Sequence, residues 1–267
     1  YPLRRQRQMC IRDRKSGEML HRVSTVFGNL LSAETDDDLQ ELAKEIMPMM
    51  SEHENNISLN EELFARIKAV YEQQDKETLS PEQHKLLEDI YNGFVRNGAN
   101  LLGEDKEKYR ALCKELSLLT LQFSENNLKE TNDYKLVITD KSQLAGLPES
   151  AVEAAAETAG EKGVEGWVFT LQAPSYGPFL TYADSRDLRR ELYMAYNTKC
   201  THDNASNNLE IVKKLANVRM EIAQLLGYDN FAEYNLQERM AQNSESVYKL
   251  LDLSLIHISE PTRPEPI

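Results

Sequence analysis

Long apolar runs are missing from this sequence. No stretch approaches the roughly 20 consecutive apolar residues that a membrane-spanning helix needs. The first 14 residues are basic and lack the apolar core of a secretory signal. We therefore expect no membrane association. A native export signal stays open, because these first residues do not resemble the rest of the chain.

Cysteine is scarce. The sequence holds three, Cys10, Cys113 and Cys200, and no pair has the spacing of a metal site. An odd, sparse count without a signal peptide is typical of reduced thiols, so we expect a cytoplasmic location. Cys113 falls on the apolar stripe of a predicted helix. We interpret it as a buried small hydrophobe rather than a reactive thiol.

Basic residues are fewer than acidic ones, 31 against 44, which gives a formal net charge of −13. Binding to a phosphate backbone needs clustered Lys and Arg, so we expect no nucleic-acid partner. Hydrophobic residues make up 40% and charged residues 28% of the chain. This is the composition of a folded protein, and the length allows one or two domains with a core.

The common catalytic motifs are also missing. The sequence has no Gly-x-Ser-x-Gly elbow, no phosphate-binding glycine loop and no Cys-x-x-Cys pair. A helical zinc protease needs two histidines four residues apart, with a glutamate beside the first. His53 and Glu54 come nearest to this pattern, but Ile57 occupies the place of the second histidine.

The other histidines have no partner in sequence. We interpret His84 as a solvent-facing residue in the first turn of a helix, and His202 as part of a polar turn. His21 and His257 lie near the two unusual ends of the chain. We therefore predict no catalytic, cofactor-binding or metal-binding residue in this sequence.

Both ends differ from the sequence between them. Residues 4–14 (RRQRQMCIRDR) match one reading frame of a transposon mosaic-end sequencing adapter, and residues 253–263 (LSLIHISEPTR) match a frame of its partner. We hypothesise that residues 1–14 and 253–267 are non-native segments. The alternative is a basic arm and a proline-rich tail that serve as interaction segments. Codons unlike the adapter in the source DNA would contradict the hypothesis.

Helical periodicity dominates the first half of the remaining chain. Thr35 is the predicted N-cap of a helix that ends near Pro48, and a shorter helix follows residues 58–60. Ser80 and the residues after it form the best start signal, with a cap, a proline at the first helical position and a capping-box glutamine. Gly98 can end that helix in the left-handed conformation.

The spacing of apolar residues changes from a helical to a β-type pattern in the middle of the chain. A long helical stripe over 109–123 precedes two β-rich segments, 134–140 and 166–171, with an Ala- and Glu-rich helix over 148–163 between them. Residues 174–182 are rich in proline and glycine and could hold a further extended segment. The only tryptophan, Trp167, is expected to pack the small sheet against helices.

Helical patterns resume near residue 186. Apolar stripes predict helices over 186–196, 211–225 and 230–240, and one more begins at Ser244. The predicted fold class is mainly α with a small β insertion. These patterns by themselves indicate a helical domain without a visible active site.

Several segments resemble the bacterial peptidyl-dipeptidase Dcp group of the thimet-oligopeptidase-like zinc metallopeptidases. They occur in the family's order and together extend over nearly all of residues 15–252. The segments are 58–67 (SLNEELFARI), 94–99 (FVRNGA), 126–128 (NNL), 187–193 (DLRRELY), 223–228 (AQLLGY) and 244–247 (SESV). Each one is modest alone, but the ordered set is specific.

The resemblance implies a mainly helical, neurolysin-like metallopeptidase fold, with residues 15–178 as a helical N-terminal lobe carrying a small β element. Residues 179–252 would begin the catalytic region. In that family a His-Glu-x-x-His helix and a later glutamate hold one zinc ion, and no residue here corresponds to them. The full-length enzyme is therefore expected to use zinc and to hydrolyse short peptides.

The segment itself is expected to bind no zinc, to be inactive and to be monomeric. The second hypothesis is a non-enzymatic acidic helical module that binds other proteins. A natural gene that stops near Asp252 would favour that module, whereas sequence that continues into a His-Glu-x-x-His helix would exclude it.

Overall fold

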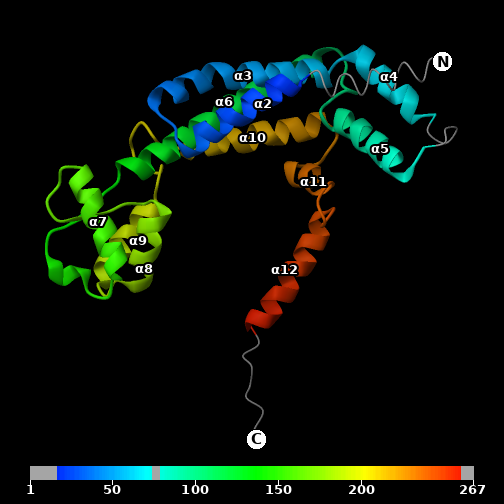
Figure 1. Ribbon diagram of the computed structural model, residues 1–267. Coiled ribbons are helices and arrows are strands. Elements are labelled where there is room, and N and C mark those ends of the chain that lie inside the picture. Colours follow the sequence, from blue (N-terminus) through cyan, green and yellow to red (C-terminus); the bar gives the residue numbers. More distant parts are fainter. Residues whose placement is uncertain (1–16, 74–78, 260–267) are drawn as a thin grey trace, which may run out of the picture. The chain divides into compact units, whose positions relative to one another are not determined.

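The computed structural model describes residues 17–73 and 79–259, and the chain forms two compact units. Unit 1 contains residues 1–118 and 216–267, and unit 2 contains residues 119–215. Two long helices, α6 (Gly103–Asp133) and α10 (Leu209–Leu225), contain the points where the chain passes from one unit to the other. Figure 1 shows the elements in chain order.

Unit 1 is helical throughout its described part. Besides portions of α6 and α10, its helices are α2 (Glu18–Ala33), α3 (Asp37–Ser58), α4 (Glu61–Tyr71), α5 (Pro81–Arg96), α11 (Phe231–Leu236) and α12 (Ser244–Ser259). Helix α2 lies where the sequence predicted no element. Within the described ranges, none of the helices combines the length and apolarity that crossing a bilayer would take.

Local capping signals set several helix starts. The predicted capping box of α5 is confirmed, because Ser80 Oγ accepts from Gln83 N and Gln83 Oε1 accepts from Ser80 N. Gly98 has the predicted positive φ, 84°. The predicted cap of α3 was wrong by one residue: Asp36, rather than Thr35, accepts from Leu39 N at 2.7 Å.

The sequence predicted that the helix opened near Thr35 would end near Pro48. Helix α3 instead continues past Pro48 to Ser58. An internal proline costs about 3 kcal/mol, since it removes one backbone hydrogen bond and crowds the preceding turn. Apolar side chains on both sides of Pro48 are half-buried and hold the helix together; they are Ile46, Met47 and Met50.

A half-buried arginine connects α5 with α11 inside unit 1. The Arg96 side chain is 11% exposed and pairs with Glu238 at 3.0 Å. Its other nitrogens donate to the Tyr234 carbonyl at 2.8 Å and to Gln237 Oε1 at 2.7 Å. The guanidinium also lies 4.3 Å from the centroid of the Tyr234 ring. These contacts place residues 234–238 against the end of α5.

Unit 2 contains the only sheet of the described residues. Its elements are β1 (Leu136–Ile138), the 3-10 turn η2 (Lys141–Leu144), α7 (Glu149–Glu161), β2 (Trp167–Phe169), α8 (Ala173–Tyr182) and α9 (Arg186–Asn197). The two strands pair antiparallel, with Val137 opposite Val168. The predicted fold class, mainly α with a small β element, is confirmed.

The core of unit 2 joins the sheet to α7, α8 and α9. Phe169 from β2 and Phe179 from α8 are 1% and 0% exposed, and their ring centroids lie 4.6 Å apart. Trp167 is half-buried against the same cluster, as predicted. The prediction of an extended segment over 174–182 was wrong. Pro174 is compatible with the first turn of a helix, and burial of Phe179 stabilises α8 despite Pro178.

Candidate functional site

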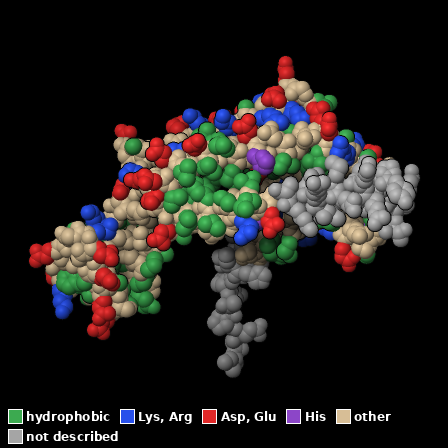
Figure 2. Space-filling model, turned by 45° about the horizontal axis from the view of Figure 1, so that its top comes forward, with side chains coloured by type: hydrophobic (Ala, Val, Ile, Leu, Met, Phe, Trp, Pro, Cys, Tyr) green, Lys and Arg blue, Asp and Glu red, His purple; other side chains and the backbone are tan. Residues whose placement is uncertain are grey.

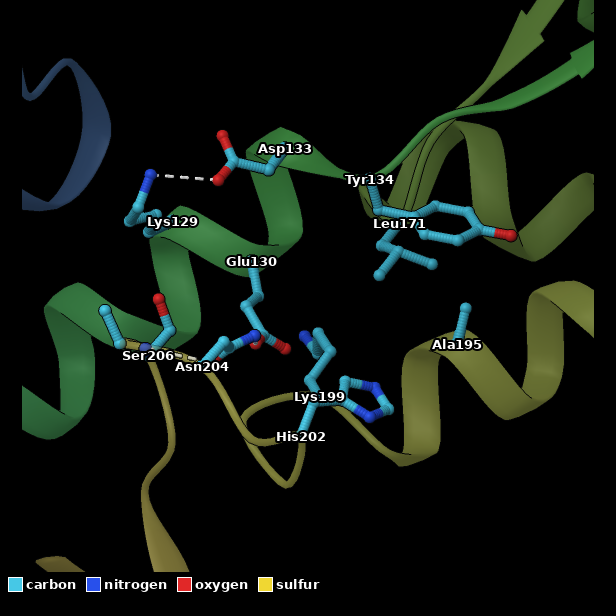
Figure 3. A pocket seen from close by; sticks show the side chains of 11 residues that line it. Lys129, Glu130, Asp133, Tyr134, Leu171, Ala195, Lys199, His202, Asn204 and Ser206 are labelled. Atoms are coloured by element: carbon cyan, nitrogen blue, oxygen red, sulfur yellow. Dashed lines mark hydrogen bonds and ion pairs between the residues drawn. The ribbon is translucent and has the colours of Figure 1, made fainter.

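A cavity of about 450 Å³ lies within unit 2. It is bounded by the end of α6, by Leu171 after β2, by the last turns of α9 and by the loop toward α10 (Figure 3). Its polar lining side chains come from segments far apart in the sequence: Lys129, Glu130, Asp133, Tyr134, Lys199, His202, Asn204 and Ser206.

The carboxylate of Glu130 connects α6 with the loop after α9 at this cavity. Its Oε2 accepts from the Cys200 backbone N at 2.5 Å, and its Oε1 accepts from Asn204 Nδ2 at 2.7 Å. Cys200 has a φ of 58°, a left-handed conformation that residues with a Cβ other than asparagine, aspartate and histidine rarely adopt. The carboxylate therefore holds the loop in a conformation that its own backbone disfavours.

The lysines of the cavity have partners within unit 2. Lys199 Nζ donates to Thr131 Oγ1 at 3.0 Å and lies 4.3 Å from the centroid of the Tyr196 ring. Lys129 pairs with Asp133 at 3.0 Å, but both side chains are more than 60% exposed. Such an exposed pair contributes little to stability.

Two further side chains of unit 2 have a raised pKa: Tyr134, which lines the cavity, and Cys200. Burial raises the pKa of Tyr134, and the charge of Glu191 adds to that effect. The Tyr134 hydroxyl is buried without a hydrogen-bond partner in the described part of the chain. Burial also raises the pKa of the Cys200 thiol, followed by the charge of Glu130, while Lys199 acts in the opposite direction. A neutral buried thiol is a poor nucleophile.

The histidines fall in separate places. His202 is exposed in the loop after α9, with Nε2 3.4 Å from Thr198 Oγ1. His53 and Glu54 are exposed on α3, His21 is exposed on α2, and His84 is half-buried on α5. The side chain of His257, like Cys10, lies outside the described residues. Residues 17–73 and 79–254 bring together no group of three or more His, Cys, Asp or Glu that could hold a metal ion.

Cys113 lines a different cavity, of about 570 Å³, within unit 1. The thiol is half-buried, and burial raises its pKa, against hydrogen bonds with Tyr109 and Asn55 that lower it. Cys113 thus lies on the apolar stripe of α6 as predicted, but it is half-buried where the sequence predicted a buried side chain.

Sequence reasoning missed the contacts of Glu130. Cys200 is 70 residues away and Asn204 is 74 residues away, so no local spacing indicated that they would meet. One carboxylate among 44 acidic residues carries no signal of its own. With both oxygens engaged, Glu130 stabilises the loop between α9 and α10 rather than acting as a free general base.

Replacing Glu130 with alanine should destabilise unit 2 by about 2–3 kcal/mol, because the Cys200 N–H loses its acceptor and the strained backbone loses its support. Urea unfolding followed through Trp167 fluorescence measures this loss. Asp133→Ala is the matched control on the same helix. It removes only the exposed pair with Lys129 and should change stability by less than about 0.5 kcal/mol. Equal losses in the two variants would contradict the role of Glu130.

Comparison of the sequence with known proteins shows which peptidases the chain is similar to. Residues 179–259 match Peptidase family M3. Oligopeptidase A of Haemophilus influenzae is 31% identical over 255 residues, which is 94% of this chain and 37% of the relative. Dipeptidyl carboxypeptidase of Escherichia coli is 34% identical over 238 residues, 89% of this chain and 35% of the relative. Residues 179–259 thus match family M3, and the chain as a whole is similar to part of these two peptidases.

The predicted family is thereby confirmed. Oligopeptidase A of Escherichia coli is 32% identical over 238 residues, close to the value for the dipeptidyl carboxypeptidase of that organism. Oligopeptidase A and dipeptidyl carboxypeptidase are therefore about equally similar to this chain. The chain spans about a third of the length of these relatives.

Proposed function

We propose that this chain is part of a zinc metallopeptidase that hydrolyses short peptides, of the peptidyl-dipeptidase or oligopeptidase type. One observation carries the proposal: proteins named for such activities align with 88–94% of the chain at 31–34% identity. The mainly helical fold with its small sheet supports it.

The proposal assigns residues 15–178 to a helical N-terminal lobe and residues 179–252 to the start of the catalytic region. The match of residues 179–259 to Peptidase family M3 supports the second assignment. Residues 1–14 and 253–267 are proposed to be non-native. The matched range includes residues 253–259, so the exact C-terminal limit needs the source DNA.

The described residues do not fit a zinc site, because they bring no three possible ligands together. We propose that the metal ligands of the whole protein lie in a His-Glu-x-x-His helix downstream of residue 252. We therefore propose that this chain does not hydrolyse peptides alone. We also propose that it is a monomer.

The purified chain should release no product from short unstructured peptides, with or without added zinc. Mass spectrometry of the reaction mixture checks this, with full-length dipeptidyl carboxypeptidase of Escherichia coli as the positive control. Release of C-terminal dipeptides that a chelator abolishes would overturn the proposed inactivity.

Extending the source DNA tests the family role itself. Sequence that continues into a His-Glu-x-x-His helix supports the metallopeptidase. A natural stop near Asp252 would instead favour a non-enzymatic acidic helical module that binds other proteins.

A further inference from the structure

The loop between α9 and α10 is held against α6 by polar contacts and buries little apolar surface. We call residues 198–208 the strap. Residues 201–205 are all exposed, and the buried strap residues are Cys200, Ser206 and Asn208. Exposed apolar side chains gather on α2, in the middle of the face shown in Figure 2. A segment with few buried apolar contacts opens more readily than the core of the protein.

Two anchors of different chemistry hold the buried residues of the strap to α6. At the first, the Glu130 carboxylate accepts from the Cys200 N–H at 2.5 Å and from the Asn204 amide at 2.7 Å (Figure 3). At the second, Asn126 Nδ2 donates to Asn208 Oδ1 at 2.8 Å, and Asn208 Nδ2 donates to a backbone carbonyl of α6 at 3.1 Å. The Asn208 N–H also donates to the Cys200 carbonyl at 2.8 Å, so the ends of the strap meet at the second anchor.

Only an ionised Glu130 satisfies the first anchor. A carboxylate accepts at both oxygens, but a protonated carboxyl group carries a donor on one of them, and both strap partners are themselves donors. Protonation therefore removes one contact, and the remaining contact is no longer charge-assisted. Cys200, with a φ of 58°, then loses support for a conformation that its backbone disfavours. The second anchor contains only neutral amide groups and does not respond to pH.

The other titratable groups around Glu130 do not replace it as an acceptor. They come from the end of α6, from the residue after it and from the strap: Lys129, Asp133, Tyr134, Lys199, Cys200 and His202. The lysines are donors only, and Asp133 is paired with Lys129 at 3.0 Å. His202 becomes a cation in acid, which removes its acceptor nitrogen. Glu130 is therefore the group whose protonation takes an acceptor away from the strap.

We propose that the strap is a pH-sensitive device. It is closed while Glu130 is ionised, and protonation of Glu130 lets residues 201–205 swing away from α6 about the second anchor while the core of unit 2 stays folded. Opening removes one wall of the cavity of about 450 Å³ and uncovers the Cys200 thiol, which belongs to a residue only 5% exposed in the closed strap. This inference goes beyond the proposed peptidase function and does not depend on it.

The rate at which dithiodipyridine labels Cys200 in the purified chain, followed by peptide mass spectrometry, tests the proposal. At neutral pH, Glu130→Gln should raise this rate by about tenfold or more, because the glutamine amide presents a donor to the strap as a protonated carboxyl group does. Asp133→Asn is the matched control on the same helix and should label like the unmodified chain.

Acidification should bring the ratio of the two Cys200 labelling rates, Glu130→Gln over the unmodified chain, toward one. In acid the unmodified Glu130 also loses its charge, and the ratio cancels the pH dependence of the labelling reaction itself. Asn204→Asp places a second carboxylate opposite Glu130 and should likewise raise labelling at neutral pH, so the test does not depend on the folding of Glu130→Gln alone.

Equal labelling of Cys200 in the unmodified chain and in both variants of the first anchor would overturn the proposal. A rate ratio that stays constant on acidification would also overturn it. The dependence on urea separates local opening from unfolding of the whole unit. Labelling that is insensitive to low urea supports the strap, whereas labelling that rises in parallel with the Trp167 unfolding transition would mean that the strap does not open by itself.

Discussion

Replacing Gly146 with alanine should cost unit 2 about 3 kcal/mol or more. Gly146 follows η2 with a φ of 87°, a left-handed conformation that penalises any Cβ. A Cβ there would also press against the Tyr182 carbonyl oxygen and the Asp184 carboxylate, closer than real side chains approach. The approach is fixed, because Asp184 N donates to the Ala145 carbonyl at 2.9 Å. The strained backbone and the steric clash of the new Cβ both destabilise the folded variant.

Urea unfolding followed through Trp167 fluorescence measures the effect, since the chain has one tryptophan and it belongs to unit 2. Gly160→Ala is the matched control. Gly160 lies inside α7 of the same unit, and a Cβ there meets no atom within 4 Å. That variant should gain about 0.5–1 kcal/mol, because alanine favours the helix interior. Similar unfolding midpoints for Gly146→Ala and the unmodified chain would contradict this account of the turn.

Truncating Phe179 to alanine should destabilise unit 2 by about 3–5 kcal/mol. The side chain is fully buried, and its ring lies at 59° to that of Phe169. Removing it leaves a cavity between α8 and the sheet, which the close packing of Leu136, Ile138 and Leu192 cannot fill.

Tyr182→Ala is the control for this truncation. It removes an aromatic ring from the same helix, but Tyr182 is 54% exposed, so the loss should stay below about 1 kcal/mol. The difference between the two variants, read from the same Trp167 unfolding curves, isolates the cost of the core cavity. Equal losses would mean that the Phe169–Phe179 contact does not stabilise unit 2.

Several features of the fold were predictable because their signals are local. The capping box at Ser80 joins residues three apart, and the left-handed Gly98 depends only on its own missing Cβ. The apolar stripe predicted over 109–123 became part of α6, with Tyr109 and Leu112 buried. The family followed from the order of short segments, since no chemistry in these residues identifies it.

Other features depended on partners that the sequence brings together only in three dimensions. Residues 174–182 form a helix because Phe179 meets Phe169 from β2, which outweighs the proline and glycine signals. Likewise α3 continues past Pro48 because the half-buried side chains on both sides of the proline stabilise the helix.

The sequence by itself determined the mainly helical class, most helix positions, the small sheet and the family. Tertiary structure decided the helix over 173–182, the loop held by Glu130 and the apolar flank that α2 leaves exposed. The physical reason is the distance along the sequence over which each kind of interaction acts. Caps, turns and stripes act between residues within a few positions, whereas burial and the Glu130 contacts join residues whose separation in sequence carries no information about their distance in space.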